Sequence, residues 1–147
     1  MTMVRHVARA AGSTGSAAPA YRVDVRVGTH QLVADEPTSA GGGDLGPTPF
    51  GLLVSGLAAC TAMTLRMYAA RKGWELTSIE VEVRYDIDDS GRSTIDRRVT
   101  VPGELTLEQG QRLAEVADRT PVTLAIRGGT PITTTFQRDN GQASPTT

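Results

Sequence analysis

The residues that could carry covalent chemistry in this chain of 147 residues are few. The chain contains one cysteine, Cys60, and two histidines, His6 and His30. The thiolate form of cysteine is a strong nucleophile, so Cys60 is the first candidate for a reacting group. One cysteine excludes an internal disulfide, and together with two histidines it falls short of the usual zinc ligand sets. We therefore expect no metal site, and the sequence gives no reason to expect an organic cofactor.

Cys60 falls within a long apolar segment, Pro49 to Lys72, that we predict to be a helix ending at Gly73. Small side chains surround the cysteine along this segment, which would let another part of the backbone approach closely. Leu57 and Met63, by their three-residue spacing, are expected on the same face as Cys60, with Met67 one turn further on. Two interpretations stay open: a reactive thiol, or a small buried side chain without chemistry.

A reactive Cys60 needs a positive charge nearby to stabilise its thiolate. The helix dipole contributes little, because its effect fades beyond the first turn. The helix itself cannot supply a cation, since Arg66 faces away and Arg71 lies about 16 Å further along the axis. Arg22 and Arg26 on the first predicted strand are the natural suppliers. The alternative is that both arginines simply cover a solvated strand face.

A glycine-rich loop precedes the helix, and residues 41–46 match the pattern G-x-G-x-x-G. In a dinucleotide site the third glycine lies within the helix that holds the pyrophosphate. Here Pro47 and Pro49 delay the helix until after the glycines, and no acidic residue follows about 20 positions on. The sequence therefore favours a mobile loop over a nucleotide site.

Alternating and helical patterns predict an α+β fold with mostly antiparallel strands. A capping-box pattern at Thr106 and Gln109 predicts a helix to about Asp118, and Thr120 with Pro121 predicts a second, shorter one. The expected strands cover residues 21–27, 30–34, 79–86, 93–101 and 130–137. We expect one domain over residues 21–137, between disordered tails at 1–20 and 138–147.

Charge and composition exclude several partners. Lys and Arg number 15 against 16 Asp and Glu, which leaves no electrostatic case for binding nucleic acid or an anionic membrane. No continuous apolar run approaches the ~18 residues of a membrane span. These features are typical of a soluble protein of the intracellular type.

The segment from Gly46 to Asp86, GPTPFGLLVSGLAACTAMTLRMYAARKGWELTSIEVEVRYD, resembles the core of the OsmC/Ohr family. The family takes its name from osmotically inducible protein C and organic hydroperoxide resistance protein. Two further stretches, HQLVADEP and EVADRTPVTLAI, also match family segments. The resemblance implies an OsmC-like fold, with antiparallel sheets packed on a long central helix that bears the cysteine. It further implies an intertwined homodimer with sites between subunits, and a cytoplasmic location.

The resemblance also implies thiol chemistry. In the family a first cysteine attacks an organic hydroperoxide and a second cysteine resolves the sulfenate; Cys60 matches the first, and Thr120 stands at the position of the second. Phe50 and Gly51 occupy the positions where active members carry a glutamate after the helix-opening proline. The family's catalytic arginine would correspond to Arg22 or Arg26.

Three functional hypotheses follow. In the first, Cys60 is the nucleophile of a one-cysteine peroxidase that depends on an external thiol reductant, with Glu36 or Asp44 orienting an arginine. Both acids can equally be turn residues of the loop. In the second, Leu57, Met63 and Met67 help to line a cleft for a small apolar molecule, without turnover. In the third, the role is structural and the cysteine is inert.

Overall fold

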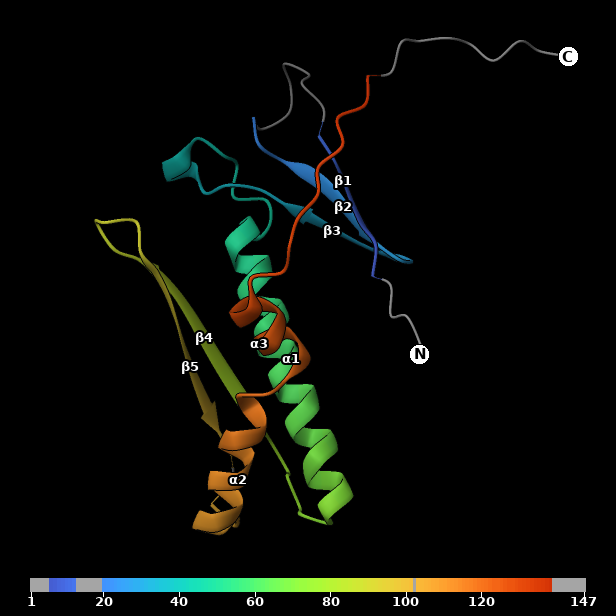
Figure 1. Cartoon of the computed structure of the whole chain (residues 1–147). Helices are drawn as coiled ribbons and strands as arrows, with labels where there is room; N and C mark the ends of the chain where they lie inside the picture. The colour runs from blue at the N-terminus through green and yellow to red at the C-terminus, as the bar shows by residue number, and fades with distance from the viewer. Residues whose placement is uncertain (1–5, 13–19, 102, 139–147) are drawn as a thin grey trace, which may run out of the picture.

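The computed structural model describes residues 6–12, 20–101 and 103–138, which form two small antiparallel sheets and three helices (Figure 1). The strands are β1 (Ala8–Ala11), β2 (Val23–Val27), β3 (His30–Ala34), β4 (Glu80–Ile87) and β5 (Ser93–Thr100). The helices are α1 (Pro49–Lys72), α2 (Leu107–Ala117) and α3 (Pro121–Gly128), with a 3-10 turn, η1, at Thr38–Ala40. The predicted α+β class is confirmed.

The first sheet has the order β1-β2-β3 and lies beyond the N-terminal end of α1 (Figure 1). Its hairpin turns at Gly28, whose φ of 59° is a conformation that glycine adopts without strain. Strand β1 pairs antiparallel with β2, Ala8 opposite Val27. The sequence placed residues 1–20 in a tail and did not predict this strand. The Ala-rich segment has no strong strand propensity of its own, so pairing with the hairpin edge determines its conformation.

The glycine-rich loop is held in place by Asp35, which is only 2% exposed. Its carboxylate accepts hydrogen bonds from the backbone N–H groups of Glu36, Gly43 and Leu45. A Cβ on Gly46 would lie 2.1 Å from the carbonyl oxygen of Val33, so only glycine fits there. The backbone of the loop therefore closes around the carboxylate of Asp35. Two of the N–H groups that a phosphate would need, those of Gly43 and Leu45, already donate to Asp35, so the nucleotide hypothesis stays rejected. The mobility of the loop stays a prediction.

Helix α1 has the predicted boundaries. At its start the Thr48 hydroxyl accepts a hydrogen bond of 3.0 Å from the N–H of Gly51, and Pro49 occupies the first turn. At its end Gly73 adopts a left-handed conformation with φ 69°. These caps fix which residues lie at which turn of the helix, and they place Cys60 near its middle.

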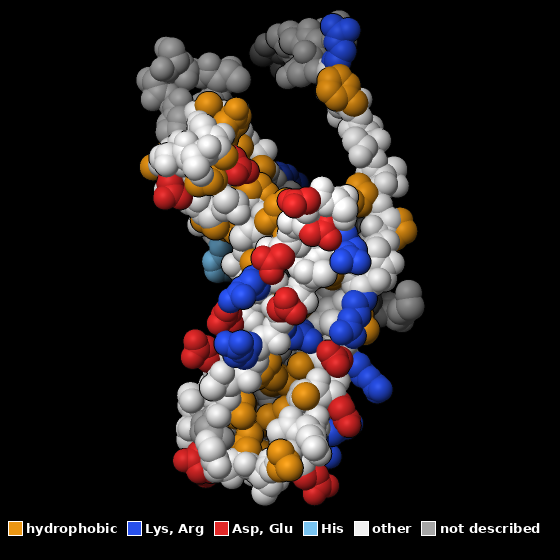
Figure 2. Space-filling view, turned by 90° about the vertical axis from the view of Figure 1, so that its left-hand side faces the viewer, with side chains coloured by type: hydrophobic (Ala, Val, Ile, Leu, Met, Phe, Trp, Pro, Cys, Tyr) orange, Lys and Arg blue, Asp and Glu red, His pale blue; other side chains and the backbone are white. Residues whose placement is uncertain are grey.

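The β4–β5 hairpin packs along α1, and α2 and α3 cover the same side of that helix (Figure 1). Alternate residues of the hairpin face outward and most of them are charged, so acidic and basic side chains are interspersed over this face (Figure 2). The core cluster consists of Leu65, Leu113 and Ala117, from α1 and α2. The predicted capping box of α2 is present, with Thr106 and Gln109 bonding reciprocally.

The predicted last strand, residues 130–137, is wrong. The structure shows no strand there, and every residue of the segment is exposed. A strand needs a neighbouring strand to bond its backbone groups. Within the described residues, this segment pairs with neither of the two sheets. Most of the two expected tails, residues 1–5, 13–19 and 139–147, lies outside the described residues.

Candidate functional site

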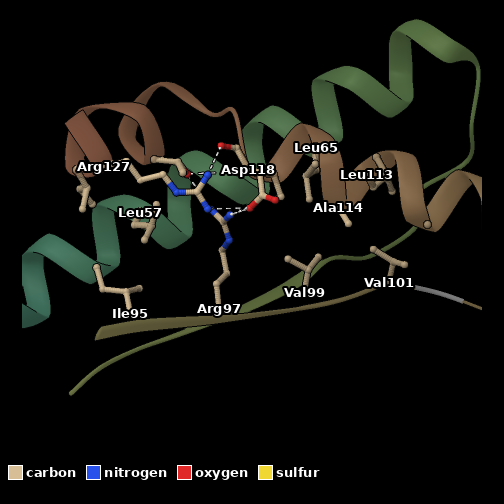
Figure 3. Close-up of a pocket in the computed structure, with 14 residues that line it drawn as sticks. Leu57, Leu65, Ile95, Arg97, Val99, Val101, Leu113, Ala114, Asp118 and Arg127 are labelled. Carbon is tan, nitrogen blue, oxygen red and sulfur yellow. Dashed lines mark hydrogen bonds and ion pairs between the residues drawn. The ribbon is translucent and has the colours of Figure 1, made fainter. Parts of the chain in front are cut away.

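The most connected polar cluster of the described residues centres on Arg97, which projects from β5 toward the helices (Figure 3). Its side chain is only 13% exposed. One guanidinium nitrogen, Nη1, donates to the hydroxyl of Thr61 at 3.0 Å and to that of Thr123 at 2.9 Å. The other, Nη2, lies 3.3 Å from Asp118 Oδ1. Arg97 thus links the sheet to α1, to α3 and to the end of α2.

The cluster extends to the position where the family's second cysteine would stand. Thr120 is fully buried and caps α3, as predicted, by accepting from the N–H of Thr123. Its hydroxyl also lies 2.7 Å from that of Thr123. A chain of hydrogen bonds therefore runs from Thr120 through Thr123 and Arg97 to Thr61, the residue that follows Cys60.

Sequence reasoning missed Arg97. The signal was present, because the inward-facing positions of β5 and its extension hold Ile95, Val99 and Val101, and Arg97 is the one charged residue in that series. A charged residue on an apolar strand face needs partners when it is buried, and here a carboxylate and two hydroxyls supply them.

Cys60 itself is half-buried and free. It lies on the side of α1 that carries Leu53, Met63 and Met67, all of them more than 40% exposed. The opposite side of the helix contributes the buried residues Leu57, Thr61, Leu65 and Ala69. Although no continuous apolar run is long enough, an 18-residue window within α1 has a mean hydropathy of 1.5, so the helix is long and apolar enough by length and composition alone to cross a membrane. That test is also passed by core helices of soluble proteins.

The predicted electrostatic partners of Cys60 lie elsewhere in this chain. Arg22, just before β2, forms a salt bridge with Asp24 at 2.9 Å, and Arg26 lies on β2 itself. Glu36 and Asp44 belong to the glycine-rich loop, where Asp44 is exposed. None of the hydrogen bonds formed among the described residues joins any of these four side chains to Cys60. Their proposed catalytic roles therefore stay predictions.

The three predicted binding residues do not come together within one chain. Met63 and Met67 are 64% and 65% exposed on the outer side of α1. Leu57 is buried on the inner side and lines a cavity of about 520 Å³ between β5 and the three helices. The expectation that Leu57 shares a face with Met63 and Cys60 is wrong for the single chain, because Leu57 faces the cavity while the methionines face outward. No group of three metal-ligating side chains occurs among residues 6–12, 20–101 and 103–138.

The structure resembles a number of solved proteins, and three of them illustrate the shared fold. The organic hydroperoxide resistance protein OsmC of Legionella pneumophila is 21% identical with a TM-score of 0.65, over 87% of this chain and 93% of its own. An OsmC-like protein of Mycoplasma pneumoniae is 18% identical with a TM-score of 0.66, over 86% and 90%. The organic hydroperoxide resistance protein OhrB of Bacillus subtilis is 25% identical with a TM-score of 0.58, over 85% and 92%.

The fold therefore agrees with the expectation drawn from the sequence around Cys60. A comparison with curated protein sequences finds none that matches this chain. The family model described as OsmC-like protein matches residues 41–135, from the glycine-rich loop to the segment after α3. This match covers well over half of the chain and includes Cys60, Arg97 and Thr120. The chain belongs to the OsmC-like protein family, as a member with a single cysteine.

Proposed function

We propose that this protein is a thiol-dependent peroxidase that reduces organic hydroperoxides with one cysteine. The observation that carries the proposal is the position of Cys60, half-buried in the middle of α1 and next in sequence to Thr61, which accepts a hydrogen bond from the buried Arg97. Organic hydroperoxide resistance proteins of other organisms share the fold. Membership of the family by itself supports a less specific function, that of a stress-related OsmC-like protein.

One turnover uses the Cys60 thiol and two molecules of an external thiol. The Cys60 thiolate attacks the outer peroxide oxygen; the S–O bond forms as the O–O bond breaks, and the alcohol leaves after taking a proton. Cys60 is then a sulfenic acid. An external thiol condenses with it to a mixed disulfide and releases water. A second thiol displaces the first, which regenerates Cys60 and yields an external disulfide.

Thr120 is the reason for proposing an external reductant. A hydroxyl cannot form a disulfide, and Thr120 is engaged as the cap of α3 at the position where the family's resolving cysteine is expected. The substitution keeps the cap and loses the thiol, because threonine accepts the same backbone hydrogen bond. The sulfenic acid therefore has no partner in this chain, whose single cysteine is Cys60 itself.

We further propose that the functional unit is an intertwined cytoplasmic homodimer. The outer side of α1 exposes Leu53, Met63 and Met67 as an apolar stripe beside Cys60, and such stripes mark interaction surfaces. A second copy would cover this stripe and would bring Arg22 or Arg26 of its own first sheet toward Cys60. Glu36 and Asp44 would orient that arginine.

The alternative is a protein that binds small apolar molecules, or has a structural role, with an inert Cys60. The observation that favours it is the absence of any close cation–thiol contact among the hydrogen bonds and ion pairs of the described residues. In that case the thiol would stay reduced in the presence of peroxide. The two candidates therefore differ in one measurable property, the trapping of a sulfenic acid.

The test is intact-mass spectrometry of the full chain after near-stoichiometric cumene hydroperoxide in the presence of dimedone. Hydrogen peroxide serves as the comparison oxidant and Cys60→Ser as the control variant. We expect rapid formation of one dimedone adduct that depends on Cys60 and is faster with the organic peroxide. An unmodified thiol, slow also toward iodoacetamide, would contradict the peroxidase and favour the alternative.

A further inference from the structure

A cavity separate from Cys60 lies between β5 and the three helices. Its volume of about 520 Å³ falls in the range of small-molecule sites. Toward one end the walls are apolar and come from β5 and its extension, α1 and α2; they are formed by Leu65, Val99, Val101, Leu113 and Ala114 (Figure 3). Cys60 is not among the lining residues, because it lies on another side of α1.

The other part of the cavity is positively charged. Arg97 and Arg127 both line it, and both direct an Nη2 atom to the same oxygen, Asp118 Oδ1, at 3.3 and 3.2 Å. Two guanidinium groups therefore share one carboxylate, which leaves a net charge of +1. Arg127 is 61% exposed, so its guanidinium can meet a ligand at the mouth without unfolding its surroundings.

The charged part of the cavity lies next to its apolar part along β5 and its extension. Arg97, Val99 and Val101 succeed one another on the inward side of the extended chain. Four residues of strand span about 13 Å, so the apolar walls continue from the guanidinium for about that length. An occupant that satisfies both parts has an anionic head and a single apolar chain.

We propose that this cavity binds an amphiphilic monocarboxylate with an unbranched, medium-length aliphatic chain. The carboxylate pairs with Arg127, whose Nη1 and Nη2 already donate to the carbonyl and to Oδ1 of Asp118 and each keep a second N–H for a two-point hydrogen bond. Arg97 stays bonded to Thr61 and Thr123 and adds its charge. The chain lies against Val99, Val101 and the leucines. The proposal does not rest on peroxidase activity, because it uses no atom of Cys60.

The test is a titration of the full chain with decanoate, below the concentration at which it forms micelles, followed by amide NMR shifts and calorimetry. Decanol is the neutral comparison. We expect saturable binding of decanoate, with shifts at β5, α2 and α3, and weaker binding of decanol. Arg127→Gln should weaken decanoate about tenfold and leave decanol unchanged, since it removes one charge-assisted donor.

Two further variants keep the test decisive. Ala114→Phe, in the apolar wall of the cavity, should abolish binding of both molecules because the ring fills the space. Arg98→Gln, on the opposite face of the same strand as Arg97, is the matched control and should change nothing. The proposal is overturned if decanoate does not saturate or its affinity is indifferent to Arg127→Gln. It is also overturned if Ala114→Phe disrupts a dimer, which would mean that a second copy occupies the cavity.

Discussion

The guanidinium of Arg97 lies 3.0 Å from the hydroxyl of Thr61, a residue 36 positions earlier in the chain and next to the single cysteine. Thr61 in turn donates to the carbonyl of Leu57 at 2.7 Å, so its oxygen has a partner on both sides. This contact ties the middle of α1 to the sheet. A substitution at Arg97 or Thr61 would therefore also affect the backbone of α1 around Cys60.

Replacing Thr61 by valine should therefore destabilise the protein. The side-chain shape is kept, but one donor of the buried Arg97 loses its acceptor, which costs about 1–3 kcal/mol. The free energy of unfolding is measured by urea denaturation. Thr64→Val, one turn along the same helix, is the matched control, because it lies beyond this cluster. Equal losses for the two variants would contradict a specific role for the Arg97–Thr61 bond.

Charging the outer stripe of α1 should separate the proposed dimer. Met63 and Met67 are exposed in one chain, so the double variant to lysine should leave the fold intact while it introduces like charges across the interface. Sedimentation is expected to show a dimer for the parent protein and a monomer for the variant. Arg66→Glu, on another side of the helix, should stay dimeric. A parent protein that sediments as a monomer would refute the dimer.

Gly46→Ala should destabilise the loop before α1. The new Cβ would lie 2.1 Å from the carbonyl oxygen of Val33, and relief of this overlap must move backbone, at a cost of about 1–3 kcal/mol. Gly110→Ala within α2 is the counterpart, since a Cβ there meets nothing within 4 Å. It should stabilise by about 0.5–1 kcal/mol. Thermal unfolding measures both, and a loss at both positions would show that steric overlap is not the cause.

The turn between β4 and β5 should respond to acid. The pKa of the Asp88 carboxyl is lowered from its ordinary value, first by the Ser90 hydroxyl and then by the backbone N–H of Arg92. A pKa below that of the unfolded chain means that Asp88 stabilises the hairpin above about pH 4 and that this contribution is lost as the pH falls further. Carboxyl NMR titration of Asp88 should give a midpoint below the ordinary value of an aspartate side chain. A midpoint at or above that ordinary value would contradict the hydrogen bonds.

Local rules in the sequence determined most of the elements. Thr48 with Pro49, Thr106 with Gln109, and Thr120 with Pro121 each specify a helix start through contacts within four residues, and all three occur. Alternation of apolar and charged residues specified the two hairpins. The likeness to a family around Cys60 was also a property of the sequence alone, because the segment from Gly46 to Asp86 is continuous.

Tertiary structure decided those features, such as side-chain roles and strand pairing, that depend on residues far apart in the sequence. Arg97 acquires its role from Thr61, Thr123 and Asp118, which lie 36, 26 and 21 positions away, and no local pattern records such distances. The strand at Ala8–Ala11 exists because β2 offers an edge, whereas residues 130–137 form none. Leu57 and the methionines share a helix but face opposite surroundings, since only packing determines which side of an apolar helix is covered. Sequence thus determined most of the elements and the single cysteine that is the candidate reacting group, and packing determined which charges surround the cavity.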